Sequence, residues 1–96
     1  MAGLDRRRGG GAGVTRAELE AGVRDLLAQV THTPPAAIGP GFDCAQSAGW
    51  SSLQHLMLIS QLEARFDVAF KNEEMPGLAT YDAIVSALAS RLDPSP

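Results

Sequence analysis

The chain has 96 residues, of which 45% are hydrophobic, 20% charged and 5% aromatic, and its formal net charge is −3. This length allows one domain with a modest core and is too short for a doubly wound sheet with its own catalytic cleft. Because Cys44 is the only cysteine, an internal disulfide and a cysteine-rich zinc site are excluded. A lone cysteine fits a reducing compartment, and we expect a cytoplasmic protein.

The beginning of the chain differs from the rest in charge. Three Arg and one Asp give residues 1–13 a charge of +2, which leaves −5 on the remainder. An acidic remainder predicts protein partners with basic patches rather than nucleic acid. We expect a disordered tail at 1–14, one domain at 15–92 and a short tail at 93–96. With no signal peptide and no long apolar run, we expect no membrane partner.

The first helix is predicted over residues 15–30. Thr15 and Glu18 form a capping box, and apolar residues follow at helical spacing. Pro34 and Pro35 prevent the helix from continuing.

Residues 31–50 form a connection that is long for a compact domain. Three of its side chains are expected to anchor it on the helices, namely Ile38, Phe42 and Trp50. Asp43 and Cys44 could be considered as a catalytic acid and nucleophile. This role is disfavoured, because Cys44 has no basic or histidine neighbour in sequence to lower its pKa.

The second helix, predicted over about 52–65, begins at two adjacent serines. Ser51 and Gln54 match the S-x-x-Q capping box. Ser52 then takes the first helical position with a free hydroxyl, beside unpaired N–H groups and the positive end of the helix dipole, where a phosphate ester is favoured. Alternatively, Ser52 is an ordinary polar residue of a first turn. Met57 is expected on the solvent side, because the inward stripe takes other positions: Leu58, Ile59, Leu62 and Phe66.

Two further helices complete the predicted fold. Asn72 is predicted to be the N-cap of a short helix, with Glu73 and Glu74 in its first turn. Thr80 is predicted to cap a last helix of apolar residues at helical spacing. No strand pattern is long enough to form a sheet. The fold class predicted from the sequence is therefore all-α, a bundle of three main helices and one short helix III.

Enzymatic and metal-binding interpretations are disfavoured. Residues 49–53 approach the G-x-S-x-G nucleophile elbow, but the final glycine and the preceding strand are missing. Ser52 and His55 can share a helix face, yet no acid is placed to orient the histidine. His32 and His55 lack the spacing of a metal site.

A family resemblance emerges from the order of residues after Gly49. In sequence these are Ser52-Leu53, Leu56, Leu58-Ile59, Leu62-Glu63, Phe66-Asp67-Val68, Phe70, Glu73-Glu74-Met75 and Thr80. This order resembles the acyl carrier proteins, without a gap over 51–71 and more loosely over 15–92. It is most similar to the discrete, free-standing carriers of polyketide and related secondary-metabolite pathways, whose signature is Gly-Trp-Asp-Ser-Leu.

The resemblance implies a four-helix acyl-carrier-like bundle that is not itself an enzyme. It implies that a phosphopantetheinyl transferase attaches 4′-phosphopantetheine from coenzyme A to Ser52. The arm would present an acyl thioester to acyl-loading and acyl-processing enzymes: an acyltransferase, a ketosynthase or an acyl-adenylating ligase. We expect a monomer without a metal site. The candidate partner-docking residues are Asp43, Met57, Glu63, Glu73 and Glu74.

One departure from the family pattern lies directly before the modified serine. The family almost always has Asp there, and this chain has Ser51. Serine caps a helix about as well, so the fold is unaffected, but loading would be slower if the transferase reads the missing charge. Two alternatives remain: an unmodified helical interaction module that binds through Met57 and an acidic face, and a peptidyl carrier, disfavoured because its Gly-Gly-His/Asp-Ser signature is missing.

Overall fold

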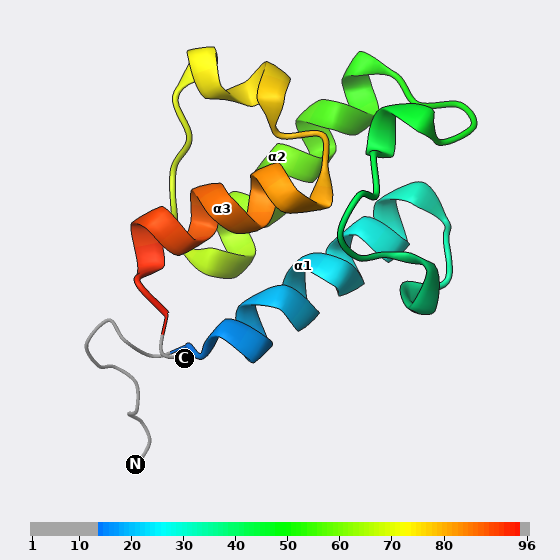
Figure 1. The fold of residues 1–96 in the computed structure, drawn as a ribbon. Coiled ribbons are helices and arrows are strands. Elements are labelled where there is room, and N and C mark those ends of the chain that lie inside the picture. The colour runs from blue at the N-terminus through cyan, green and yellow to red at the C-terminus, as the bar shows by residue number, and fades with distance from the viewer. Residues whose placement is uncertain (1–13, 95–96) are drawn as a thin grey trace.

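The computed structural model describes residues 14–94, and this part of the chain is helical without a strand (Figure 1). The α-helices are α1 (Arg16–Thr31), α2 (Ser52–Phe66) and α3 (Tyr81–Leu92). Three short 3₁₀ helices lie between them: η2 (Pro35–Ala37), η3 (Cys44–Gln46) and η4 (Asn72–Gly77). The predicted all-α fold is confirmed for these residues. Of the predicted tails at 1–14 and 93–96, residues 1–13 and 95–96 lie outside the described part.

Hydroxyl caps set where α1 and α3 begin. The Thr15 hydroxyl accepts the Glu18 N–H at 3.1 Å, and the Glu18 carboxylate accepts the Thr15 N–H at 2.9 Å, which completes the predicted capping box. Thr80 accepts the Ala83 N–H at 3.1 Å, as predicted for the last helix. Because a cap fixes the backbone where it forms, these helices begin within one residue of their predicted starts. Each α-helix ends at a residue with positive φ: His32, Asp67 and Asp93.

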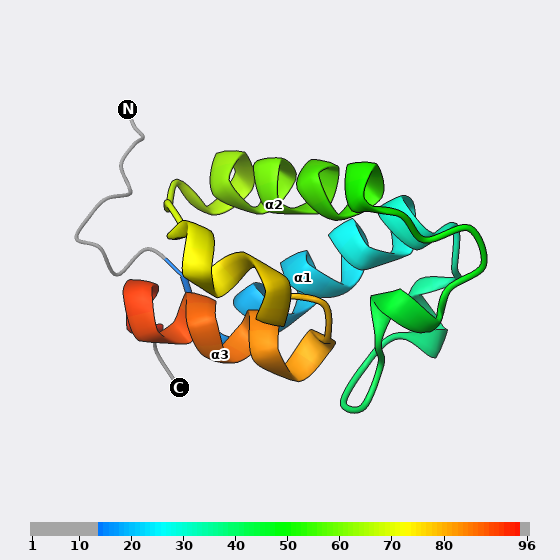
Figure 2. The same ribbon diagram turned by 90° about the horizontal axis from the view of Figure 1, so that it is seen from above.

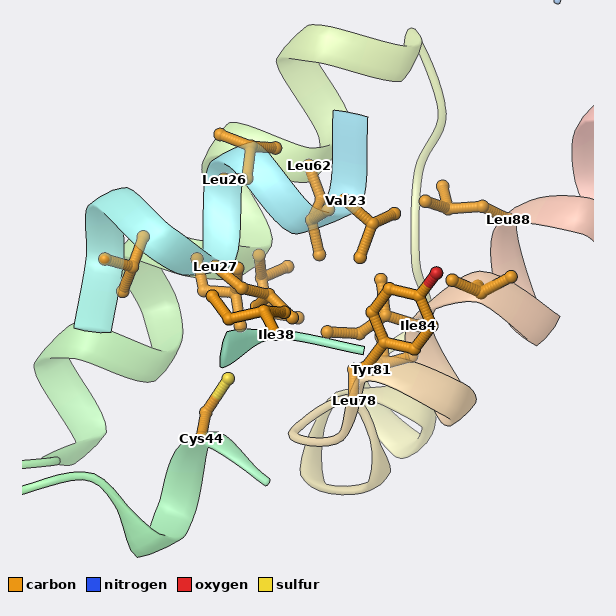
Figure 3. Close-up of a cluster of buried hydrophobic side chains, with 14 of the residues drawn as sticks. Val23, Leu26, Leu27, Ile38, Cys44, Leu62, Leu78, Tyr81, Ile84 and Leu88 are labelled. Atoms are coloured by element: carbon orange, nitrogen blue, oxygen red, sulfur yellow. The ribbon is translucent and has the colours of Figure 1, made fainter. Parts of the chain in front are cut away.

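The core lies where α1 packs against both α2 and α3 (Figure 2). In Figure 3, Val23 and Leu27 of α1 meet Leu62 of α2 and Ile84 of α3. On the α2 side, Gly22 allows close approach, since a Cβ there would lie 2.8 Å from the Phe66 ring. Burial of these aliphatic side chains is the main source of stability in a domain with so few aromatics. No helix in residues 14–94 has both the length and the apolar character needed to cross a membrane.

The long connection between α1 and α2 is pinned to the start of α3. Cys44 donates its N–H to the Ala79 carbonyl at 2.8 Å, and Tyr81 donates to the Phe42 carbonyl at 2.9 Å, forming an isolated antiparallel bridge. Ile38 is buried, as predicted, whereas the other two predicted anchors, Phe42 and Trp50, are only partly buried. The connection therefore holds the residues before Ser52 in a fixed place.

The short helix before α3 differs from its prediction. Lys71, not Asn72, occupies the N-cap position, and Asn72 is already the first residue of η4. The reason is that the Glu74 carboxylate accepts the Lys71 N–H at 2.8 Å, so the first turn closes without the Asn72 side chain. The element is a 3₁₀ helix that includes Pro76, because a residue without an N–H is tolerated in so short a turn.

Candidate functional site

Ser52 is the first residue of α2, and its side chain is exposed. Its hydroxyl makes no hydrogen bond with any other residue in the described range, since the cap of α2 comes from Ser51. A hydroxyl at the surface on the first turn of a helix is accessible to an enzyme and fixed in direction by the helix behind it.

The cap of α2 is weaker than those of the other two α-helices. The Ser51 hydroxyl accepts the Gln54 N–H at 3.4 Å, which is long for an N–H···O hydrogen bond. The return half of the predicted capping box is missing: the Gln54 side chain does not bond to Ser51, and its Oε1 is buried without a partner. The Gln54 side chain therefore points into the protein instead of back over the helix end.

The backbone around Ser52 favours a negative group. The first N–H groups of a helix have no partner inside it, and here only those of Gln54 and His55 are taken, by the side chain and the carbonyl of Ser51. The first turn contains no acidic residue that would compete for the positive end of the dipole. An anion held on Ser52 Oγ would lie at this positive end.

A groove of about 680 Å³ opens beside Ser52, between the first turns of α2 and η4. Its walls combine aromatic, aliphatic and neutral polar side chains, and its lining residues are Ala45, Trp50, Ser51, Ser52, His55, Leu56, Asn72, Met75, Pro76 and Ala79. The only titratable side chain among them is His55.

His55 ties the two walls of this groove together. Its Nε2 lies 2.5 Å from the Met75 carbonyl oxygen, and because a carbonyl only accepts, Nε2 carries the proton. Its ring also meets Trp50 edge-on, with 6.0 Å between centroids and an angle of 83°. The contacts of His55 therefore stabilise the fold. Ser52 and His55, both in the described part of the chain, do not form the hydrogen bond that a serine hydrolase needs.

Three large apolar side chains next to Ser52 point into solvent. Leu53 is 67% exposed, Leu56 57% and Met57 47%. The exposure of Met57 agrees with its prediction. Leu53 was not singled out from the sequence, although placing Leu58, Ile59 and Leu62 inward turns position 53 to the opposite side of a helix with 3.6 residues per turn.

Three of the four acidic docking candidates are held by contacts within the fold. Asp43 accepts the Ala45 N–H at 2.9 Å, Glu63 accepts the Phe70 N–H at 2.8 Å, and Glu74 pairs with the Arg91 guanidinium. Glu63 lies about 16 Å along the axis of α2 from Ser52. Glu73 is exposed and makes no ion pair with the described part of the chain. Three of the four carboxylates thus support the fold.

The segment of the chain that contains Ser52 has no formal charge. Residues 44–62, which include η3 and most of α2, contain no Asp, Glu, Lys or Arg. None of the four acidic docking candidates lies in this segment, although Glu73 and Glu74 directly follow Asn72, which lines the groove beside Ser52.

Cys44 and the histidines offer no alternative reactive centre. Cys44 is fully buried, and burial, reinforced by the negative charge of Asp43, raises its pKa to about 11. A buried, protonated thiol is a poor nucleophile. Between residues 14 and 94, no three His, Cys, Asp or Glu side chains are close enough together to hold a metal ion.

No protein-family model matches the chain, and no curated protein matches it significantly.

Proposed function

We propose that this chain is an acyl carrier protein whose Ser52 receives 4′-phosphopantetheine from coenzyme A. The observation that carries the proposal is the exposed Ser52 hydroxyl at the N-terminus of α2, which has no hydrogen-bond partner in the described part of the chain. The resemblance to the free-standing carriers of secondary-metabolite pathways, with their four-helix bundle, supports the same residue. The all-α fold around it is compatible with this family.

The residues around Ser52 fit a phosphodiester. Unpaired N–H groups and the dipole of α2 favour the negative charge, and no carboxylate of the first turn opposes it. In the loading reaction, Ser52 Oγ forms a bond to the β-phosphorus of coenzyme A while the bond from phosphorus to the 3′,5′-ADP oxygen breaks, and the serine proton leaves. Once attached, the group supplies a terminal thiol that holds an acyl chain as a thioester.

The role of the protein in this proposal is to hold the attached arm at a fixed place on its surface. The bridge between the long connection and the start of α3 holds the chain that enters α2, and His55 holds η4 against α2. Ser52 therefore sits on a supported helix end, so a flexible arm attached there reaches partner enzymes from a fixed point at high effective concentration.

Intact-protein mass spectrometry tests the proposal. We expect incubation with coenzyme A and a broad-specificity phosphopantetheinyl transferase to add one phosphopantetheinyl group. Ser52→Ala abolishes the addition, because the accepting oxygen is lost, and Ser51→Ala retains it, because Ser51 only caps the helix. No mass gain of the wild type with any transferase tested, or equal gain in Ser52→Ala, would contradict the proposal.

A second candidate function is an unmodified interaction module of the same fold. The exposed Leu53, Leu56 and Met57 favour it, since contiguous apolar side chains on a surface indicate a protein contact. A pull-down separates the two functions. A module that works without modification recovers its partner equally well with Ser52→Ala, whereas a carrier loses the enzymes that recognise its loaded arm.

A further inference from the structure

His55 is the only residue lining the groove beside Ser52 whose side chain can carry a positive charge. Ser52 and His55 are three positions apart on α2, so their Cβ atoms are neighbours, about 5–6 Å apart. Helical side chains lean toward the N-terminus of their helix, which brings the His55 ring toward the turn that begins at Ser52. An anionic group attached to Ser52 Oγ therefore has this ring as its neighbour.

The two nitrogens of the His55 ring are used differently. Nε2 donates to the Met75 carbonyl oxygen, and the edge-on contact with Trp50 supports the plane of the ring. Nδ1, the nitrogen nearer the backbone of α2, makes no hydrogen bond with residues 14–94. In this tautomer Nδ1 carries a lone pair, and it becomes a donor when it takes up a proton. The ring is therefore already oriented, and one of its nitrogens is unused.

A phosphodiester on Ser52 is a suitable partner for Nδ1. Its two non-bridging oxygens share one negative charge and extend beyond Ser52 Oγ, which by itself does not bond to the ring. A negative charge beside an imidazole favours the protonated ring, and its N–H then forms a charge-assisted hydrogen bond to a phosphate oxygen. The proton comes from solvent, and no covalent bond is made or broken.

The other charged groups near the groove do not replace His55. The titratable residues of the flanking segments all lie outside the groove lining: Asp43, Cys44, Lys71, Glu73 and Glu74. Asp43 accepts the Ala45 N–H at 2.9 Å, Glu74 pairs with Arg91, and Glu73 is exposed, where salt and water screen its charge. Within the lining, no second cation is available to a phosphodiester and no carboxylate competes for the ring.

We propose that His55 binds the phosphodiester on Ser52 through Nδ1 and so holds the root of the 4′-phosphopantetheine arm on the groove side of α2. The inference rests on the function proposed above and adds a binding residue to it. Because Nε2 keeps its hydrogen bond to the Met75 carbonyl, a single ring joins the attached arm to η4.

Phosphorus-31 NMR of the loaded chain tests the inference, because a phosphodiester keeps one charge between about pH 5 and 8, the range in which histidine titrates. We expect the phosphorus signal of the wild type to follow a single titration in this range. His55→Gln removes Nδ1 but supplies an amide N–H that can reach the Met75 carbonyl, so it should keep the contact with η4 and lose the titration of the signal. Urea unfolding checks that the variant is folded.

His32→Asn is the matched control. His32 is exposed at the end of α1 with a φ of 54°, a conformation that asparagine tolerates, and the variant leaves His55 as the only histidine of the chain. Its phosphorus signal should titrate as in the wild type. Nitrogen-15 NMR of this single-histidine chain should show that loading raises the fraction of rings protonated at Nδ1 by about twofold or more near pH 7. This second measurement decides by itself if His55→Gln does not fold or is not loaded.

Three outcomes overturn the inference: a phosphorus signal that is constant with pH in the loaded wild type, a titration that persists in His55→Gln, and a protonated fraction at Nδ1 that loading leaves unchanged. A wild-type chain that no transferase modifies overturns the proposed function instead, and intact-protein mass spectrometry reports this before any NMR measurement. The two failures are therefore distinguishable.

Discussion

Two grooves on this molecule differ in how their polar groups are used. The groove between α1 and α3 is lined by charged side chains that already have partners: Arg16 pairs with Glu20 at 2.8 Å, Arg24 donates to the Ile38 carbonyl at 3.1 Å, and the Asp82 carboxylate accepts the Gly41 N–H at 2.8 Å. The contacts of Arg24 and Asp82 join α1 and α3 to the long connection. The charged side of the molecule is therefore concerned with holding the fold.

The groove beside Ser52 has the opposite character. Its lining carries no formal charge, the Ser52 hydroxyl has no partner among residues 14–94, and Leu56 on its edge is 57% exposed. A polar or apolar group that the fold leaves unused is available for an external molecule. The difference indicates that stability and binding depend on different grooves, so substitutions in the two grooves should have separable effects.

The largest effect on stability is expected from an apolar residue of the charged groove. Val85 lines that groove and is 3% exposed. Val85→Ala removes two buried methyl groups and should lower the free energy of unfolding by about 1.5–2.5 kcal/mol. Leu56→Ala, which removes more atoms from the other groove, should change it by less than about 0.5 kcal/mol. Urea unfolding followed by circular dichroism measures both. Equal losses would break the separation between the two sides.

A second, smaller effect tests the link between the sides. Arg91 of α3 pairs with Glu74 of η4, stacks 4.7 Å above the Phe70 ring and donates to the Ala69 carbonyl. Because η4 forms one wall of the groove beside Ser52, this cluster attaches that wall to α3. The hydrogen bond from Arg91, followed by that from the Lys71 N–H, lowers the pKa of Glu74 below its usual value of 4.5.

The sign of the pH dependence follows from that lowered pKa. Because its pKa is lower in the folded chain, Glu74 binds a proton more readily in the unfolded chain. Its contribution to the free energy of unfolding is therefore present above pH 4.5 and is lost as the pH falls through the lower pKa of the folded state. Glu74→Gln should therefore melt below the wild type near neutral pH, and the gap should narrow as the pH falls below 4.5. Thermal melts near neutral pH and below pH 4.5 measure the gap, with Glu73→Gln as the neighbouring control. A gap that widens in acid would contradict the assigned role of Glu74.

Helix starts were predictable from the sequence because each depends on a few neighbouring residues. Thr15, Ser51 and Thr80 cap helices as predicted, since a hydroxyl followed by helix-forming residues specifies its own first turn. The candidate residue Ser52 follows from the same local rule. Its position at the first turn of α2, and its exposure, were therefore accessible without a structure.

The surroundings of Ser52 were not predictable, because they depend on contacts between distant segments. The bridge from Asp43 to Thr80 and the hydrogen bond from His55 to the Met75 carbonyl join residues that no spacing rule connects. Glu63 read as a surface acid, and only the folded chain brings the Phe70 N–H to it. The Gln54 side chain fits the capping pattern in sequence, yet its Oε1 is buried without a partner instead.

The smallest expected effect concerns the weak cap beside Ser52. Ser51 accepts the Gln54 N–H at 3.4 Å, whereas the caps of α1 and α3 each span 3.1 Å. Ser51→Asp introduces the residue that the acyl carrier proteins, which this sequence resembles, almost always have at this position, and it adds a charge at the positive end of the α2 dipole. We expect it to raise the free energy of unfolding by about 0.3–0.8 kcal/mol at low salt, and by less at high salt.

The control for this last change places the same charge at the opposite end of a helix. Ser90 is exposed in the last turn of α3, where the dipole is negative, so Ser90→Asp should lower the free energy of unfolding by a similar amount. Opposite signs in urea titrations at low salt would establish that charge at the helix end is the cause. Ser51→Asp can also be compared with the wild type for the rate at which Ser52 is loaded. If the variant is loaded faster at low salt and not at high salt, the loading enzyme recognises charge at the start of α2. The separation between the two grooves would then hold for stability and not for function.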